Sequence, residues 1–313
     1  MALRLKDLPL GAFGAVMGLA GLGLSARAAA TVFPGVVRAP AYFTELWVIL
    51  GLAAFILLLA AFLAKLARYP AAVKEEFTNP ATLGFCGALP VGMTLVAGGI
   101  APYAVFIGNL LWWAGGALLL AFQLWALLRW LSGGIELARL NAGWLIILVG
   151  GIVVPGPGIA LGHVEASRFF FGVSASIAPL LTALLLYRAM VAAPLPEALR
   201  PSWFILLVPP SLIYANGVAL FAFDFLEILY FFGIVLAIAL LVYARNFLRW
   251  PFAPSWWAFT FPLDALAYAA ARYAQGHPSP PWKLAAAAAL AVATLFVVVA
   301  LWKTARSAAS RAA

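Results

Sequence analysis

The feature that most constrains this chain is a series of long, nearly uncharged apolar runs that continues from one end to the other. A helix that crosses the hydrocarbon core of a bilayer needs about 20 mostly apolar residues. Within such a run only a helix satisfies every backbone hydrogen bond locally. Ten runs of suitable length occur, at 8–28, 43–66, 82–97, 105–130, 143–161, 169–190, 203–222, 225–243, 257–273 and 282–302. The sequence therefore predicts an all-α integral membrane protein in which residues 1–313 form one transmembrane domain.

The composition supports this prediction. Hydrophobic residues make up 66% of the chain and charged residues 9%, whereas ordinary soluble proteins carry roughly a quarter charged residues. The loops between the runs are short, so no soluble domain is expected between them.

The distribution of Lys and Arg predicts the orientation of the chain. If the amino terminus is cytoplasmic, fourteen of the nineteen Lys and Arg residues, Arg4 among them, fall on the cytoplasmic side. The other five are Arg27, Arg38, Arg168, Arg272 and Lys283. Positive residues are retained on the cytoplasmic side of membranes. We therefore expect a multi-pass protein of the plasma membrane, which in bacteria is the inner membrane, with both termini cytoplasmic. The net charge of +9 then needs no nucleic-acid partner.

The first run has an alternative interpretation as a cleaved signal peptide, because a basic start and an apolar stretch precede small residues at 26–30. Two features favour a retained helix. The run is longer than a usual signal core, and Gly11, Gly14, Gly18 and Gly21 are spaced three and four apart. That spacing places them on one small-residue face, which suits close helix packing.

Residues that would support catalysis or cofactor binding are scarce. The chain has one cysteine, Cys86, and two histidines, His163 and His277, so neither an internal disulfide nor a multi-ligand metal or haem site is expected. An Asp-x-x-Asp pair, a His-x-x-x-His motif, a phosphate-binding loop and a nucleophile elbow are all missing. The sequence predicts no catalytic residues, metal or cofactor, although a non-conducting assembly subunit remains an alternative.

Proline and glycine alternate along the series of runs. The third, fifth, seventh and ninth runs contain Pro90, Pro155, Pro209 and Pro262, whereas most even-numbered runs are uninterrupted and Pro179 in the sixth is the exception. A proline frees a backbone carbonyl, which is tolerated beside protein or a water-filled cavity but costly against lipid. This pattern predicts an inner ring of odd-numbered helices around a pore. The residues predicted to line it are Gly14, Gly18, Pro90, Pro155, Pro209 and Pro262.

Acidic residues within the runs are rare, and Asp264 and Glu227 are the plainest examples. Carriers coupled to protons or cations usually place several carboxylates near the middle of the membrane. Their scarcity favours passive conduction, and an apolar, nearly neutral path favours weakly hydrated monovalent anions. Glu227 is interpreted as an interfacial or interhelical residue.

Several segments resemble one known family in the same order along the chain. The stretch 255–263, Ser-Trp-Trp-Ala-Phe-Thr-Phe-Pro-Leu, is similar to the ninth-helix segment of the tellurite-resistance and dicarboxylate transporter family, which includes bacterial TehA and the plant guard-cell slow anion channels. Residues 79–92, 144–155 and 200–210 resemble its third, fifth and seventh helices. The likeness covers nearly the whole chain.

The resemblance implies five helical hairpins around a central pore, with the odd helices innermost and a separate pore in each protomer of a homotrimer. It also implies that an aromatic ring of the ninth helix closes the pore, and alignment of the Trp-Trp and Phe-Pro steps places that gate at Phe261, with Phe259 as the alternative. The function so implied is a gated channel for small monovalent anions such as chloride or nitrate. A carrier that exports dicarboxylate, sulfite or tellurite-related anions is the alternative within the family.

Asp264 departs from the family pattern, which usually has a small or hydroxylated residue there. It follows Phe261 by three residues and therefore lies on nearly the same helix face. An ionised Asp264 near the pore would repel anions, or take part in proton-linked transport. A protonated carboxyl, a pair with Arg272 and a helix contact are the other interpretations.

Overall fold

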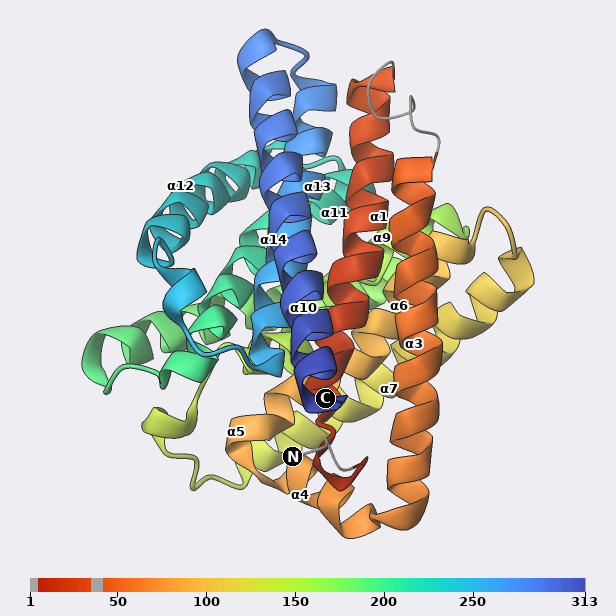
Figure 1. Cartoon of the computed structure of the whole chain (residues 1–313). Coiled ribbons are helices and arrows are strands. Elements are labelled where there is room, and N and C mark those ends of the chain that lie inside the picture. The colour runs from red at the N-terminus through yellow and green to blue at the C-terminus, as the bar shows by residue number, and fades with distance from the viewer. Residues whose placement is uncertain (1–4, 35–41, 313) are drawn as a thin grey trace.

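The computed structural model describes residues 5–34 and 42–312, and these residues form helices joined by short turns (Figure 1). Nine described helices are long and apolar enough to cross a membrane: Leu10–Val32, Tyr42–Arg68, Pro80–Ile100, Val105–Leu131, Gly143–Ala160, Val164–Val191, Glu197–Phe221, Asp224–Tyr243 and Pro280–Ser310. Each corresponds to one predicted run, with ends shifted by a few residues. The all-α membrane fold is confirmed.

The ninth predicted run, 257–273, is helical but does not belong to these nine spans. It lies in η9 (Pro254–Phe259) and α13 (Thr260–Gly276), which follow each other directly. Asp264 and Arg272 lower the apolar character of this segment, and most of α13 is buried inside the protein. The structure therefore supports nine spans by length and composition, and the count of ten stays a prediction.

The odd-numbered segments are built from several short pieces, whereas the even-numbered spans are continuous helices. The odd segments are η2 (Leu10–Phe13) with α1 (Gly14–Val32); α5 (Pro80–Leu83), η3 (Gly84–Gly87) and α6 (Ala88–Ile100); α8 (Gly143–Val149), η5 (Gly150–Ile152) and α9 (Pro155–Ala160); η6 (Glu197–Leu207) with α11 (Val208–Phe221); and η9 with α13. The even spans are α3 (Tyr42–Arg68), α7 (Val105–Leu131), α10 (Val164–Val191), α12 (Glu227–Tyr243) and α14 (Pro280–Ala312). The shorter helices are η1 (Leu5–Asp7), α4 (Pro70–Thr78), η4 (Leu137–Arg139), η7 (Asp224–Leu226) and η8 (Phe247–Arg249).

Proline explains why the odd segments are composite. Pro90, Pro155, Pro209 and Pro262 each lie in the first turn of an α-helical piece that follows a tighter turn or 3-10 segment. The first turn has no intrahelical partner for its backbone N–H groups, so a proline costs little there. Pro179, by contrast, lies inside the continuous helix α10.

Burial separates the two sets of segments. In the apolar 18-residue stretch that characterises each span, 61% to 89% of residues are buried in the four odd-numbered spans, against 22% to 33% in the five even-numbered spans. The odd-numbered segments therefore form the interior, as predicted from their prolines and glycines. Their arrangement as five hairpins around one pore stays a prediction.

The glycine face of the first span packs against η9 and α13. A Cβ on Gly18 would stand 2.0 Å from Thr260 Oγ1, and a Cβ on Gly14 would stand 3.5 Å from Trp257 Cβ. The absence of side chains at these glycines allows the two helices to approach closely. Gly14, Gly18 and Gly21 of the predicted small-residue face thus form the contact surface for the segment that carries Phe261, whereas Gly11 packs against Phe85 of η3.

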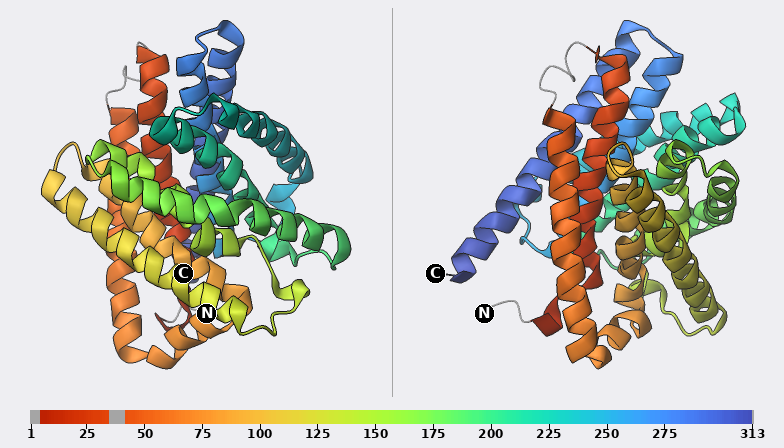
Figure 2. Two further views of the ribbon diagram at one scale, coloured as in Figure 1. Left: turned by 180° about the vertical axis from the view of Figure 1, so that it is seen from behind. Right: turned by 90° about the vertical axis from the view of Figure 1, so that its right-hand side faces the viewer.

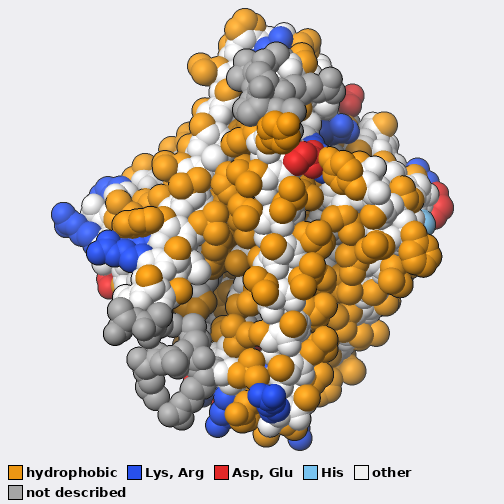
Figure 3. All heavy atoms as spheres, turned by 45° about the vertical axis from the view of Figure 1, so that its right-hand side comes forward, with side chains coloured by type: hydrophobic (Ala, Val, Ile, Leu, Met, Phe, Trp, Pro, Cys, Tyr) orange, Lys and Arg blue, Asp and Glu red, His pale blue; other side chains and the backbone are white. Residues whose placement is uncertain are grey.

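The outer surface and the termini fit a multi-pass membrane protein. Figure 3 shows a face on which hydrophobic side chains form a broad, nearly charge-free band. The first described residues, in η1, and the C-terminal end of α14 lie toward the same end of the molecule in Figure 2. Arg4 and Arg38, which were counted in the predicted distribution of Lys and Arg across the membrane, lie outside the described residues. The side chain of Arg311 also lies outside them.

Candidate functional site

Among the described residues, two cavities lie between the buried segments, one toward each end of α1. We call the one on the side of the chain termini the proximal cavity; it has a volume of about 250 Å³ and is lined by Pro9, Glu76 and Ser255 among others. The distal cavity, about 330 Å³, is lined by residues that include Arg27, Arg272 and Gln275.

Phe261 and Val153 are the two residues that line both cavities. Phe261 belongs to the first turn of α13 and is 6% exposed. Val153 lies in the turn between η5 and α9. The phenyl ring therefore stands at the junction of the two cavities. The family resemblance predicted Phe261 as the gate, whereas nothing in the sequence indicated a role for Val153.

Hydrogen bonds fix the start of α13. Thr260 Oγ1 donates to the Trp257 carbonyl at 2.8 Å, and Ser25 Oγ of α1 donates to the Asp264 carbonyl at 2.7 Å. The indole N–H of Trp257 donates to Thr304 of α14 at 3.2 Å. The backbone around Phe261 is thus held from two neighbouring helices.

Phe259, the alternative gate residue, occupies different surroundings. Its ring lies 4.8 Å from that of Phe204 and 5.3 Å from that of Phe296, in an aromatic cluster that also includes Trp256. It is 1% exposed and lines neither cavity. Its contacts are those of a packing residue.

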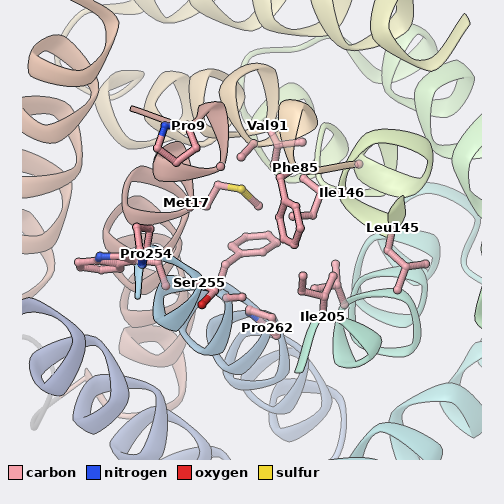
Figure 4. Close-up of a pocket in the computed structure, with 18 of the residues that line it drawn as sticks. Pro9, Met17, Phe85, Val91, Leu145, Ile146, Ile205, Pro254, Ser255 and Pro262 are labelled. Atoms are coloured by element: carbon pink, nitrogen blue, oxygen red, sulfur yellow. The ribbon is translucent and has the colours of Figure 1, made fainter. Parts of the chain in front are cut away.

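The wall of the proximal cavity is mostly apolar. Figure 4 shows Met17, Phe85, Val91 and Ile205 around this space, with the ring of Phe85 directed into it. A Cβ on Gly143 would stand 2.9 Å from the tip of that ring, so the glycine makes room for it. Phe85 lies in the segment 79–92 that resembles the family's third helix, and nothing in its spacing indicated this placement.

Glu76 is the acidic residue of the proximal cavity lining, and Lys65 pairs with it. Lys65 Nζ donates to Glu76 Oε1, and also to the Leu8 carbonyl at 2.7 Å. Glu76 Oε2 accepts from the Leu10 backbone N–H at 2.7 Å. These contacts tie the N-terminal segment to α3 and α4, and they compensate the Glu76 charge beside the cavity.

The distal cavity has a basic lining. Arg27 is ion-paired with Glu45 at 3.0 Å and also donates to the Gly98 carbonyl at 3.2 Å. Arg272 donates to Gln275 at 3.2 Å, and among the described residues no carboxylate lies within ion-pair distance of it. The predicted alternative of an Asp264–Arg272 pair therefore does not occur in the structure. Arg272 supplies a positive charge to the distal cavity.

Asp264 lines the distal cavity and is 1% exposed. Neither of its carboxyl oxygens has a hydrogen-bond partner among the described residues. Glu227, at the start of α12, lies 3.6 Å from His277 and does not line either cavity. That position agrees with its interpretation as an interhelical residue.

Tyr103 lies in the turn between α6 and α7, beside the Arg27–Glu45 pair. A hydrogen bond with Glu45 is the main cause that raises the pKa of the Tyr103 phenol, and the nearby Arg27 lowers it by less.

The predicted pore-lining residues fall into two groups. Gly14 and Pro262 line the proximal cavity, whereas Gly18, Pro90, Pro155 and Pro209 line neither cavity. Residues one or two positions from the latter prolines do reach the cavities, and these are Val91, Pro157 and Val208. The prolines set where the helices break, while neighbouring side chains face the open space.

Among the described residues, no group of three or more His, Cys, Asp or Glu side chains is arranged to hold a metal ion.

Comparison with known proteins identifies similar anion channels and transporters. The S-type anion channel SLAH3 of Arabidopsis thaliana is 27% identical over 303 residues, which is 95% of this chain and 48% of that protein. The guard cell S-type anion channel SLAC1 of the same plant is 24% identical over 305 residues, 93% of this chain and 54% of that protein. A protein of Methanocaldococcus jannaschii, uncharacterized transporter MJ0762, is 26% identical over 237 residues, 67% of this chain and 69% of that protein.

The chain thus spans about half the length of these plant relatives. The family model described as "SLAC1: Voltage-dependent anion channel" matches residues 7–305, which is nearly the entire sequence. The match includes the composite odd-numbered segments, both cavities and Phe261. The chain is therefore a multi-pass membrane protein that belongs to the SLAC1 family of voltage-dependent anion channels.

Proposed function

We propose that this protein is a gated anion channel in which Phe261 closes the path between the proximal and distal cavities. The observation that carries the proposal is the shared position of Phe261, whose ring contributes to the walls of both spaces. Movement of this ring, or its removal, would join the cavities into one path through the buried segments. Membership of an anion channel family supports the same function.

The charges around the path support anions as the permeating species. Arg272 lines the distal cavity without a carboxylate at ion-pair distance among the described residues, and Lys65 compensates Glu76 beside the proximal cavity. The rest of the proximal wall is mostly apolar. Such a wall offers few groups to replace a hydration shell, so ions that lose water cheaply pass most easily. Small monovalent anions such as chloride and nitrate are the proposed permeating ions.

The proposed setting is a bacterial inner membrane, with the proximal cavity on the cytoplasmic side. The excess of Lys and Arg near the chain termini and the proximal loops supports this orientation. We also propose a homotrimer with one path in each protomer, for which the support is the family resemblance. Native mass spectrometry of the purified protein in detergent tests the stoichiometry, and a monomer or dimer would contradict it.

The function is tested with proteoliposomes loaded with chloride. We expect faster chloride efflux from vesicles containing Phe261→Ala than from vesicles containing the wild type, because the substitution removes the ring between the cavities. Empty vesicles and vesicles containing Phe259→Ala are the controls. Equal efflux from Phe261→Ala and empty vesicles would refute the channel proposal.

One observation favours the carrier as a second candidate function. Asp264 is a buried carboxyl in the distal cavity, and such groups take part in proton-linked transport. A carrier would show saturable uptake of dicarboxylate, sulfite or tellurite-related anions that is lost in Asp264→Asn. A channel shows unitary current steps instead, so single-channel recording separates the two functions.

A further inference from the structure

The unpartnered carboxyl of Asp264 lies beside the Phe261 ring. A Cβ on Gly21 of α1 would stand 3.0 Å from Asp264 Oδ2 and 3.0 Å from Phe261 Cδ2, so these two atoms are at most about 6 Å apart. Gly21 leaves the space into which both groups project. An anion that passes the ring must therefore also pass the carboxyl.

The backbone of Asp264 is anchored, while its side chain is not. Ser25 Oγ donates to the Asp264 carbonyl at 2.7 Å, which fixes the main chain against α1. The carboxyl itself lines the distal cavity, is 1% exposed and has no hydrogen-bond partner among the described residues. Buried polar atoms normally have partners, so an unpartnered carboxyl at a cavity wall requires an explanation. A permeating ion or a proton is the partner that this location admits.

The surroundings of the carboxyl contain few other titratable groups. Arg27 from α1 and Tyr268 and Arg272 from α13 line the same cavity, while α6, α9 and α11 contribute only uncharged residues such as Asn216. Glu45 lies behind Arg27 as its ion-pair partner. Tyr214 of α11 and Tyr230 of α12 pack against Tyr273, with ring centroids 6.0 Å and 4.6 Å from its ring, and they do not line the distal cavity.

The other charged groups on helices packed against α13 do not line the distal cavity. Among the described side chains they are Glu227 of α12 beside His277, Glu197 and Arg200 of η6 paired with each other, and Lys283, Lys303 and Arg306 of α14. Arg side chains remain charged in proteins and Tyr titrates near about pH 10. Asp264 is therefore the residue of this lining whose type titrates in the acid to neutral range.

We infer that Asp264 is a specificity-determining residue of the path, whose protonation controls the passage of anions at the Phe261 gate. With its proton the carboxyl is neutral and donates a hydrogen bond to a small anion that has passed the ring. Without its proton it carries a negative charge at the same point and repels that anion. The inference rests on the proposed channel function and adds an acid-activated step to it.

Coulomb's law sets the size of the effect. Two unit charges about 6 Å apart in a medium with an effective dielectric constant of about 20 repel each other enough for roughly a hundredfold change in a rate. Arg272 and Arg27 in the same cavity reduce this repulsion. We therefore expect at least about a tenfold difference in anion current between the two forms of Asp264.

The experiment uses the Phe261→Ala channel in planar bilayers, so that opening of the gate does not limit the current. The pH of the distal side is stepped from about 4 to about 9, a range that covers the titration of shifted carboxyl groups. In Phe261→Ala the anion current should fall at least about tenfold as the pH rises. In Phe261→Ala/Asp264→Asn it should stay at the acid level at every pH.

Two further variants complete the experiment. Phe261→Ala/Asp224→Asn makes the same chemical change at an exposed residue between α11 and α12, and it should retain the pH dependence of Phe261→Ala. Phe261→Ala/Asp264→Ser replaces the carboxyl with a smaller group and should abolish the dependence, as Asn does.

The outcomes distinguish this inference from the proposed function. A conducting Phe261→Ala channel whose current does not depend on pH, or whose pH dependence persists with Asn or Ser at position 264, overturns the inference and leaves the channel function standing. A Phe261→Ala protein that is silent at every pH refutes the channel function, and the role of Asp264 falls with it.

Discussion

Removal of Lys65 tests whether the charge beside the proximal cavity must be compensated. Lys65 is 2% exposed and its Glu76 partner 13%, and the pair also holds the Leu8 carbonyl and the Leu10 N–H. Removing one partner of a buried pair leaves the other charge uncompensated, which typically costs about 3–5 kcal/mol. We therefore expect Lys65→Met to lower the free energy of unfolding by about this amount. It should also lower anion current, because Glu76 then presents a bare negative charge to the path.

The double variant Lys65→Met/Glu76→Gln isolates the charge from the loss of packing. We expect it to be more stable than Lys65→Met and to recover most of the anion current, because the uncompensated carboxylate is gone. The matched control is Arg139→Met, since the Arg139–Glu136 pair is more than half exposed and such pairs contribute about 0–1 kcal/mol.

Unfolding in mixed detergent micelles and current in planar bilayers are the two measurements. If Lys65→Met costs no more than Arg139→Met, or if Glu76→Gln fails to restore current to it, then Lys65 does not act by compensating the Glu76 charge.

The remaining predictions concern packing and one tyrosine. Gly18→Ala should destabilise the protein by about 1–3 kcal/mol, because its Cβ would overlap Thr260 Oγ1; Gly172→Ala, where nothing lies within 4 Å, should not, and thermal melting compares the two. Phe259→Ala should cost about 3–5 kcal/mol by emptying part of the aromatic cluster without raising chloride efflux, and an efflux as fast as that of Phe261→Ala would contradict this. The hydrogen bond with Glu45 stabilises the protonated Tyr103 phenol, so its contribution is present below the ordinary tyrosine pKa of about 10 and is lost as the pH rises through the raised value. Ultraviolet titration of phenolate with Tyr103→Phe as reference measures this pKa, and a value at or below about 10 would contradict it.

The helical fold could be predicted from the sequence because its signal is spread over many residues. Each apolar run contains about twenty residues that point to the same structure, and Lys and Arg between the runs mark their ends. Nine of the predicted runs correspond to helices long and apolar enough to cross a membrane. The segment at 254–276 was harder to classify, because burial inside the protein lets it carry Asp264 and Arg272 where a lipid-facing helix would carry apolar residues. Burial inside the protein, away from lipid, therefore explains why this helix is less apolar than the other spans.

The site was less predictable than the fold. Prolines mark the helix breaks, but Pro90, Pro155 and Pro209 line neither cavity, because a break says nothing about which side of the helix faces open space. Val153 and Phe85 carry no local signal and reach the cavities only through the packing of distant segments. Phe261 was distinguished from Phe259 by resemblance, and the structure shows the physical difference between them, a cavity junction for one and an aromatic cluster for the other.

The central claim is that the Phe261 ring closes an anion-selective path between the two cavities. Recording in planar bilayers with unequal chloride salt concentrations on the two sides tests it most directly. We expect Phe261→Ala to show unitary currents that reverse near the chloride equilibrium potential, at a much higher open probability than the wild type. Currents that reverse near the cation potential, or a silent Phe261→Ala protein that is folded by thermal melting, would contradict the claim.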